Sequence, residues 1–390
     1  MEMIDRDSAF LGAVRSVAVD VAAVHADDVD RQARFPAEAI AALREAESLS
    51  GFVPSSLGGA GVSLPAIAQA CFELGRHCAA TGMIFAMHQI QAITIVRHLE
   101  DSPWFTAYLG RLHEEQRLIA SVTSEVGTGG DMGRSIAALT DCAEGGLEFT
   151  KRALTVSYGA HADDYFTTLR RTPSSEETDQ ALVLHPRDET ELTPTGAWDT
   201  LGMRGTCSPS FTVHARCAPE QVLPTPFSTV LSETSPVSFL LWSQVWLGLA
   251  TEAFERGHSF VRAAARRDPG APPPPAAGAM SRVLSELWSF RSDVRAALED
   301  FIAGDEDPDR SSPRSLASTL RFNTLKLSAS ERAPRICLAV LEAVGVNAYR
   351  NDSEYAVGRL LRDALSARLM VSNERIHAVD AGLLTILKSV

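Results

Sequence analysis

The segment 362–376, RDALSARLMVSNERI, contains the side chains near the end of the chain that are best suited to acid–base chemistry. Glu374 has a carboxylate, which can accept a proton from a substrate when the fold places it in a cleft. The alternative is a solvated helix residue that pairs with its neighbour Arg375. Glu233 and His377 are two further groups that could accept a proton. The chain therefore has a candidate base, whose use depends on what the rest of the fold places beside it.

A second stretch, IASVTSEVGTGGDMGRS at 119–135, could hold a ligand. Its GTGGD portion includes Gly129 and Gly130, where a ligand can approach the backbone N–H groups closely because no side chain intervenes. The alternative is a glycine-rich turn that binds nothing. This loop must lie opposite the candidate base if the two are to serve one site.

Other common chemistries have no signature in the sequence. The six cysteines form no CxxC pair and show no zinc-ligand spacing, so we expect buried thiols in a reducing compartment and no metal site. No GxGxxG, GxxxxGK[ST] or GxSxG motif occurs, and no strand–helix alternation indicates a Rossmann domain.

The composition narrows the class of protein. A formal net charge of −13 gives no electrostatic reason to bind nucleic acid or an anionic membrane. The N-terminus lacks a basic region followed by an apolar run, and no stretch is expected to reach the roughly 20 apolar residues of a membrane-spanning helix. We therefore expect a cytoplasmic protein with neither a nucleic-acid nor a membrane partner.

The elements that would position these residues follow a simple order. Apolar positions recur at helical spacing through residues 1–118. Short segments rich in Val, Thr, Phe and Tyr follow within 119–228 and predict a β-domain. Long apolar helices are expected in 229–390. The predicted fold class is thus α+β, with an N-terminal helical domain, a central β-domain and a C-terminal four-helix bundle.

Five stretches in this order resemble the acyl-CoA dehydrogenase family over nearly the whole chain. They are VPSSLGGAGVS, IASVTSEVGTGGDMGRS, LTVSYGAHADDYFTTLR, GAWDTLGMRGTCSPSFTVHARCAPEQVLP and EYAVGRLLRDA. The second is similar to the family's TEP.AGSD loop, and the fourth, similar to LGmRgs, is the most specific. The resemblance implies FAD between the β-domain and the helical bundle, a dimer or tetramer of the chain, and oxidation of an acyl thioester.

The resemblance also implies which residues hold the cofactor. Thr123 matches the loop threonine that contacts the flavin, and Gly129 and Gly130 lie in the loop itself, with Gly130 in place of a serine. Thr155 replaces a tryptophan that covers the flavin, and Ser157 matches a threonine hydroxyl.

Arg266 matches an arginine that reaches the diphosphate of the partner subunit's FAD, and a guanidinium suits phosphate by its geometry. The alternative is an arginine at the end of a helix, stabilised there by the helix dipole. Asn347 and Ala348 replace a double glycine near the adenine end of FAD.

The usual catalytic glutamate is missing from both of its family positions, which hold Val371 and Ser238. The leading hypothesis is α,β-dehydrogenation of an acyl thioester, on CoA or an acyl carrier protein, with Glu374 as a relocated base. The alternatives are a flavin-dependent monooxygenase, which does not need that glutamate, and a non-catalytic subunit of the family.

Overall fold

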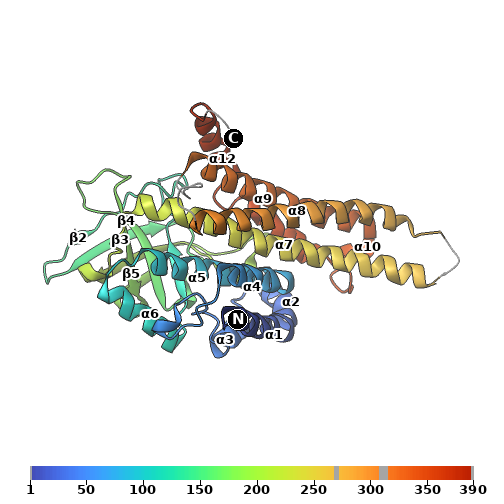
Figure 1. The fold of residues 1–390 in the computed structure, drawn as a ribbon, viewed down its shortest axis with the longest axis horizontal. Helices are drawn as coiled ribbons and strands as arrows, with labels where there is room; N and C mark the ends of the chain where they lie inside the picture. The colour runs from blue at the N-terminus through green and yellow to red at the C-terminus, as the bar shows by residue number, and fades with distance from the viewer. Residues whose placement is uncertain (1, 268–271, 307–314, 388–390) are drawn as a thin grey trace.

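The computed structural model describes residues 2–267, 272–306 and 315–387, and the chain runs from helices through two sheets to a helical bundle (Figure 1). The N-terminal helices are α1 (Glu2–Ser16), α2 (Ala23–Gln32), α3 (Ala37–Glu45), α4 (Leu64–His77), α5 (Ala79–His98) and α6 (Pro103–Glu115). A single π-helical turn, Val17–Ala22, joins α1 to α2.

The strands form two small sheets. They are β1 (Ile119–Val122), β2 (Thr140–Asp141), β3 (Leu147–Ala153), β4 (Asp164–Arg170), β5 (Gln180–Pro186), β6 (Thr190–Pro194) and β7 (Phe211–Cys217). One sheet has the order β1-β4-β5, with β1 parallel to β4, and the other has the antiparallel order β2-β3-β7-β6. The side chains of β3 and β7 alternate between buried and more exposed positions, so each of these strands turns one face to the core.

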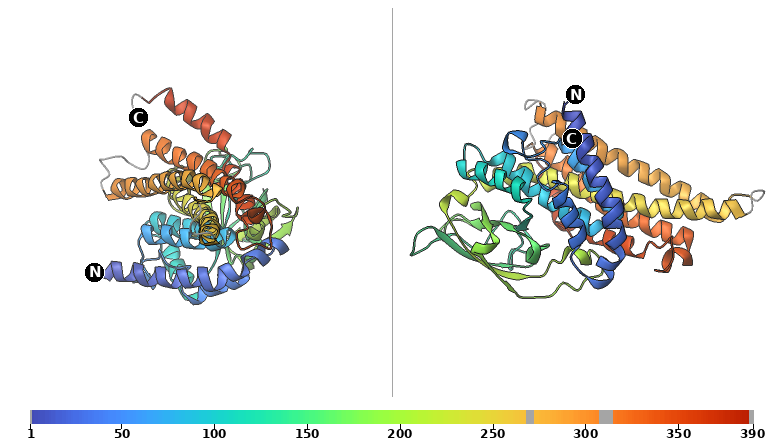
Figure 2. Two further views of the ribbon diagram at one scale, coloured as in Figure 1. Left: turned by 90° about the vertical axis from the view of Figure 1, so that its right-hand side faces the viewer. Right: turned by 90° about the horizontal axis from the view of Figure 1, so that it is seen from below.

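The C-terminal helices are α7 (Phe227–Arg267), α8 (Pro275–Glu306), α9 (Leu316–Val344), α10 (Val346–Tyr349), α11 (Gly358–Leu365) and α12 (Asn373–Leu384). The long helices α7, α8 and α9 pack along one another and extend well beyond the sheets (Figures 1 and 2). The described part of the chain thus has the predicted α+β class. The predicted domain boundaries, 118/119 and 228/229, lie next to the starts of β1 and α7, and the division into domains stays a proposal.

Helix α4 crosses α7 at close range because glycines face each other there. A Cβ added to Gly75 would lie 2.5 Å from the carbonyl oxygen of Val245, and one added to Gly248 would lie 2.2 Å from that of Phe72. Any larger residue would push the two backbones apart. Two glycines therefore bring the N-terminal helices against the central helix of the bundle.

His88 joins the N-terminal helices to the β-domain. Its Nε2 lies 2.7 Å from the carbonyl oxygen of Leu49, and its Nδ1 accepts a hydrogen bond of 3.1 Å from the backbone N–H of Ile119 at the start of β1. Complete burial lowers the pKa of His88 to about 4. The ring is therefore neutral at physiological pH and has a structural role.

The loop 201–204 of the β-domain docks onto α11. Asp363 accepts a 2.6 Å hydrogen bond from the backbone N–H of Met203. A Cβ on Gly202 would lie 2.1 Å from the carbonyl oxygen of Arg362, so only glycine fits here. The Arg362 guanidinium donates to the carbonyl oxygen of Leu201 and pairs with Asp30. Two of the five recognised stretches, LGMRG and RDA, are thus in direct contact.

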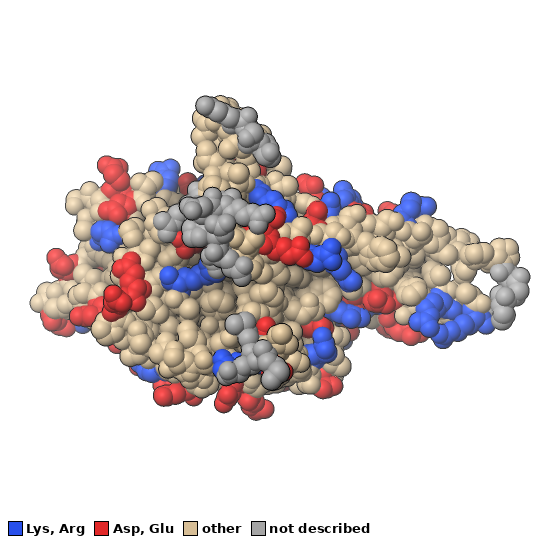
Figure 3. Space-filling model, viewed as in Figure 1, with Lys and Arg blue, Asp and Glu red and all other residues tan. Residues whose placement is uncertain are grey.

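Two described helical segments, Ile4–Gln32 and Ala79–His98, are long and apolar enough to cross a bilayer. The expectation that no segment would reach this length is therefore wrong. In the second segment, 83% of the apolar window is buried inside the protein, which is the pattern of a core helix; the figure for the first is 33%. Figure 3 shows acidic and basic side chains interspersed on the face drawn, without an extended basic area.

The docking of α11 predicts a stability effect at Asp363. Removing its side chain in Asp363→Ala leaves a buried N–H of Met203 without an acceptor, which we expect to lower the free energy of unfolding by about 1–3 kcal/mol. Asp363→Asn keeps an acceptor oxygen, and burial already raises the pKa of the Asp363 carboxyl to about 6, so the loss should be smaller. Urea unfolding of the three proteins measures this; equal losses in both variants would contradict it.

Candidate functional site

Four hydroxyl-bearing residues meet where β1 and β3 end. We call Thr123, Ser124, Thr155 and Ser157 the hydroxyl edge. The Ser124 hydroxyl donates to the carbonyl oxygen of Thr155 at 2.7 Å and accepts from its backbone N–H at 3.1 Å. Ser157 accepts a 3.0 Å hydrogen bond from the Ser208 hydroxyl. The fold therefore brings together the three hydroxyl residues predicted from the sequence and adds Ser124.

The edge has capacity for a ligand. Within the described residues, the Thr123 hydroxyl makes its only hydrogen-bond contact with Ser121 at 3.5 Å. The Thr155 hydroxyl makes its only one there with Ser124 at 3.4 Å, and both distances are at the weak limit of a hydrogen bond. Thr155 is exposed and Thr123 half-buried. Both hydroxyls can thus donate to, or accept from, a molecule placed against this edge.

Glu125, the residue after Ser124, anchors the hydroxyl edge through its buried carboxylate. Its carboxylate accepts hydrogen bonds from the backbone N–H groups of Ala137 at 2.7 Å and Ile136 at 3.0 Å, and from the Ser135 hydroxyl at 2.8 Å. The buried Lys151 ammonium lies 3.6 Å away, and burial lowers its pKa to about 8. A buried, fully bonded carboxylate of this kind holds the loop after β1 in one conformation.

The position of Glu125 changes how the family motif is placed on the chain. In TEP.AGSD the aspartate follows the threonine by seven positions, and counting back from Asp131 reaches Ser124, with Glu125 at the motif's glutamate. Ser124 is also the hydroxyl that bridges to Thr155. The spacing to Asp131 was the signal that could have identified Ser124 from the sequence.

The loop 127–131 that follows is open and rich in left-handed backbone. Gly127, Gly129 and Gly130 have φ values of +101°, +63° and +80°. A Cβ at Gly130 would meet nothing within 4 Å, so space lies beside its backbone. Asp131 closes the loop by accepting the backbone N–H of Gly133 at 3.0 Å. Successive amides in such a conformation can face an anion together.

Arg375 links this loop to α12. Its Nη1 donates to the carbonyl oxygen of Gly129 at 2.8 Å, and its Nη2 lies 3.1 Å from the Asp131 carboxylate. Residues separated by 246 positions in the sequence are therefore neighbours. Sequence reasoning named Arg375 only as a partner for Glu374 and missed this contact.

The turn before α12 is held by a buried lysine. Val371 adopts a left-handed φ of +49°, which is unusual for a β-branched residue, and it packs against the core. Two residues on, Asn373 accepts a 2.6 Å hydrogen bond from the Lys326 ammonium and bonds to Ser330. Lys326 is fully buried, and burial lowers its pKa to about 8.

The candidate bases are not placed at the hydroxyl edge. Glu374 lies in the first turn of α12, is exposed, and makes no hydrogen bond or ion pair within the described residues. α12 projects from the body of the protein (Figure 1) but contacts α9, where the Asn323 side chain donates a hydrogen bond to Asp380. Glu233 on α7 pairs with His98 at 3.5 Å, and His377 is exposed. Ser238 is buried and donates to the carbonyl oxygen of Thr234 at 2.9 Å.

Arg266 lies apart from the other predicted residues. It is exposed at the end of α7, and this end of the helix is far from the sheets (Figure 1). Within one chain it cannot join the hydroxyl edge, and its assignment to the partner subunit's cofactor stays a prediction. Of the two residues that replace the double glycine, Asn347 is exposed and Ala348 is buried.

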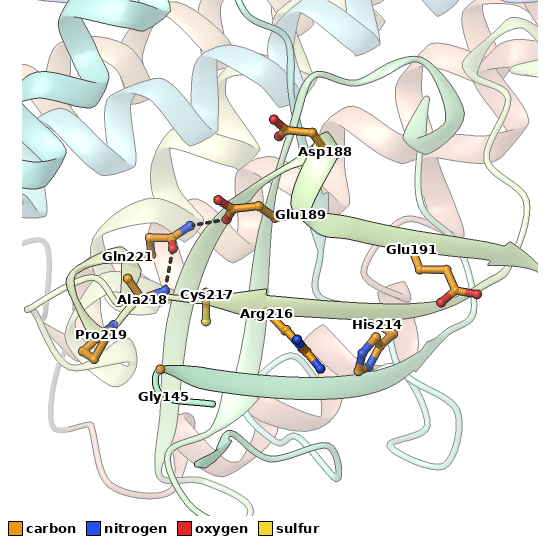
Figure 4. A pocket seen from close by; sticks show the side chains of 11 residues that line it. Gly145, Asp188, Glu189, Glu191, His214, Arg216, Cys217, Ala218, Pro219 and Gln221 are labelled. Carbon is orange, nitrogen blue, oxygen red and sulfur yellow. Dashed lines mark hydrogen bonds between the residues drawn. The ribbon is translucent and has the colours of Figure 1, made fainter. Parts of the chain in front are cut away.

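A hollow of about 730 Å³ lies elsewhere, on the β-domain near the start of β6 and the end of β7 (Figure 4). Its lining includes Glu189, Glu191, His214 and Arg216, and it shares no residue with the hydroxyl edge or the loop 127–131. Its polar side chains are engaged with other side chains: Gln221 donates to Glu189, His214 bonds to Thr150, and Arg216 pairs with Glu144. Size alone therefore does not identify the chemical site.

The hydroxyl edge and the loop 127–131 fit a flavin. An isoalloxazine ring has one edge of nitrogen and carbonyl oxygen atoms, which needs hydrogen-bond partners, and apolar faces, which need contact. Thr123 and Thr155 have hydroxyls with spare capacity, and the side chain of Leu154, 47% exposed, offers apolar surface beside them. These residues are suited to a flavin, and their role in binding one stays a prediction.

Comparisons with known proteins agree. Residues 5–101 match the family "Acyl-CoA dehydrogenase, N-terminal domain". L-evernosamine nitrososynthase of a Micromonospora species is 26% identical over 91% of this chain and 84% of that protein. Human mitochondrial short-chain specific acyl-CoA dehydrogenase is 30% identical over 46% of this chain and 43% of its own length. The chain is thus similar to the acyl-CoA dehydrogenase family, and its homologues are flavin-dependent enzymes of that family.

The fold has close counterparts among solved structures. FMN-bound TdsC from Paenibacillus sp. A11-2 superposes with a TM-score of 0.83 at 19% identity, covering 96% of each chain. TdsC is a dibenzothiophene monooxygenase. At that identity the likeness shows a shared fold. The predicted fold class and the family resemblance are thus confirmed, and the choice of reaction is not decided by them.

Lys326 predicts a pH dependence of stability. Its pKa falls from 10.5 to about 8 on folding, so the unfolded chain binds more protons between these values and wild-type stability should rise as pH increases from about 8 to 10. Lys326→Met lacks this titration. Urea unfolding at several pH values should show the difference in free energy of unfolding between the two proteins changing across that window; a constant difference would contradict the burial argument.

Proposed function

We propose that this protein is a flavin-dependent monooxygenase acting on a small molecule. One observation carries the proposal: the family's base position holds Val371, packed on the core, while its nearest replacement, Glu374, faces solvent. Proton removal from an acyl thioester therefore has no group in place. Thr123 and Ser157 nonetheless keep a hydroxyl at two of the family's flavin-contacting positions, which supports a reaction that needs the flavin and not the base.

Two groups of residues have separate roles in the proposed reaction. When bound in its reduced form, a flavin supplies the two electrons with which dioxygen is split, one oxygen atom going to the substrate and the other to water. The hydroxyl edge orients the ring through Thr123, Ser124, Thr155 and Ser157. The apolar side chains of Met370 and Val371, half-buried against the core, exclude water on the side from which dehydrogenases draw a base.

We propose FMN in place of the FAD expected from the family. Asn347 and Ala348 add side chains where a double glycine would approach the adenine half, and Ala348 is fully buried. FMN lacks that half. The FMN-bound neighbour TdsC supports the same choice. FMN keeps one of the two phosphates of FAD, so the prediction that Arg266 contacts the cofactor of the partner subunit is compatible with either flavin.

The substrate class follows from the relatives as an analogy. A nitrososynthase oxidises nitrogen and a dibenzothiophene monooxygenase acts on a sulfur heterocycle, so we propose a nitrogen- or sulfur-containing small molecule in specialised metabolism. We further propose a cytoplasmic homo-oligomer, either a dimer or a tetramer. The reduced flavin would come from a separate reductase, because the two sheets include no nicotinamide-binding βαβ unit among the described residues.

Dehydrogenation of an acyl thioester is the second candidate. The human short-chain relative acts on acyl-CoA by its name, and the backbone N–H at Val371 could still polarise a thioester carbonyl. This reading would require FAD, a CoA or acyl-carrier-protein substrate, and a base that moves into the cleft. Glu374 would have to turn inward with α12.

Two assays distinguish the candidates. Under air, the protein supplied with reduced FMN and ¹⁸O₂ should add one labelled oxygen atom to an amino sugar or a thioether, seen as a mass increase in the product. Under argon, oxidised flavin on the protein should not bleach with butyryl-CoA or other acyl-CoA thioesters. Bleaching without oxygen transfer would overturn the proposal in favour of dehydrogenation.

A further inference from the structure

Lys326 is a buried cation that bonds to a neutral group. Its side chain on α9 is fully buried, and its ammonium donates a 2.6 Å hydrogen bond to the side-chain oxygen of Asn373, the first residue of α12. Buried lysines are almost always paired with an acid, because an ammonium loses its hydration on burial. Within the described residues, this ammonium has the Asn373 amide as its only hydrogen-bond partner. The contact therefore closes over a charge that water solvates better.

The charged groups around α9 do not compensate for this burial. Within the described residues, the charged side chains on the elements packed against α9 are exposed or bonded to other partners. They include Glu233 on α7, Asp293 and Asp300 on α8, Asp363 on α11, Arg368 before α12, and Glu374 and Asp380 on α12. Burial is the sole cause that lowers the pKa of Lys326 from 10.5 to about 8. The closed environment therefore favours the neutral amine.

The turn that leads to Asn373 is strained. Val371 has a left-handed φ of +49°, which costs energy in a β-branched residue. The half-buried side chains of Met370 and Val371 pack against the core from this turn. When the segment 370–373 lifts, the backbone of Val371 relaxes and water reaches the ammonium of Lys326. Two separate costs are thus relieved by one movement.

We infer that the turn 370–373 is a lid whose closure Lys326 opposes through its charge: the ammonium favours the lifted turn, and the neutral amine favours the closed turn. The inference rests on the proposed function, because the closed turn places Met370 and Val371 where they exclude water from the site. The open turn admits the substrate, and the closed turn keeps water from the reaction. Lys326 is thus a positioning residue that acts through Asn373.

The direction of the pH dependence follows from the protons that each form binds. The pKa of Lys326 is about 8 in the closed form and returns toward 10.5 when water reaches the ammonium, so the open form binds more protons between these values. Closure therefore strengthens as the pH rises through this window and weakens as it falls. Full hydration of the ammonium changes the closing equilibrium by roughly tenfold to thirtyfold between pH 7 and 9.5.

Hydrogen–deuterium exchange of the full-length protein measures closure without flavin or substrate. The backbone N–H groups of Met370, Ser372 and Ile376 are hydrogen-bonded in the turn and in the start of α12, so they report on it. Their protection factors, which divide out the intrinsic pH dependence of exchange, should rise by roughly tenfold to thirtyfold from pH 7 to 9.5 in the wild type. Protection that stays constant or falls over this range would overturn the inference.

Two variants should remove this pH dependence by opposite changes. Lys326→Met removes the charge, and Asn373→Asp pairs it with a carboxylate, which raises the pKa of Lys326. In both, the protection factors should change by less than about twofold between pH 7 and 9.5. Asn373→Asp leaves Lys326 in place, so it decides the matter even if Lys326→Met does not fold. A wild-type pH dependence in either folded variant would contradict the inference.

Asn323→Ala is the matched control. Asn323 lies about one helical turn before Lys326 on α9, and its side chain donates a 2.5 Å hydrogen bond to Asp380 of α12. Its loss loosens the same pair of helices and leaves the titrating group intact. Protection should fall at every pH, while the rise between pH 7 and 9.5 is kept. Loss of that rise would show that it reports general packing of α12, which would overturn the role of Lys326.

The products of oxygen reduction test the consequence for the reaction. In the productive course, reduced flavin supplies two electrons and two protons to O₂, and one oxygen atom goes to the substrate while the other leaves as water. In the competing course, the same electrons and protons convert O₂ to hydrogen peroxide. The ratio of oxygenated product to peroxide should rise with pH in the wild type and not in Lys326→Met. A ratio that does not follow protection would overturn the water-excluding role of the turn.

The two readouts separate this inference from the proposed function. The expected exchange pattern without any oxygen transfer would support the lid and overturn only the reaction. Oxygen transfer with protection that does not depend on pH would support the reaction and overturn the lid. Absence of both would overturn both.

Discussion

The site depends on the contact between the β-domain loop 201–204 and helix α11. Asp363 accepts the backbone N–H of Met203, and Gly202 allows the carbonyl oxygen of Arg362 to approach within a distance that a Cβ would forbid. This joint sets where the sheets lie relative to the segment that leads into α12. Together with the contacts of Arg375 with Gly129 and Asp131, it fixes the turn at Val371 relative to the β-domain that carries the hydroxyl edge.

Family members that remove a proton need a carboxylate in the cleft, and this chain has replaced that group with core packing. Val371 contributes to the hydrophobic core in a left-handed turn, and the buried Lys326 holds the following Asn373. The turn is therefore held by packing and by the Lys326 hydrogen bond, without an acid–base group at position 371. Gly130 is a second position of this kind, because it lacks the hydroxyl of the family's serine. The Arg375 side chain on α12 contacts the same loop at Gly129.

The sequence predicted the fold because the recognised motifs are the places where backbones approach one another. Glycines at close contacts and a buried Asp363 leave a strict local signature. The positions of Thr123, Thr155 and Ser157 just after strands could be predicted for the same reason, while their role as cofactor ligands stays a prediction. Arg375 could not, because its role depends on a contact with Gly129 that lies 246 positions away, and the direction of Glu374 depends on the phase of α12 after an irregular turn.

The most direct test of this account is a crystal structure of the protein grown with FMN. The account predicts the isoalloxazine ring against Thr123, Ser124, Thr155 and Ser157, with Val371 on its other side. Electron density that placed the flavin in the hollow near His214, or side chains of the chain itself filling the space beside the hydroxyl edge, would contradict it.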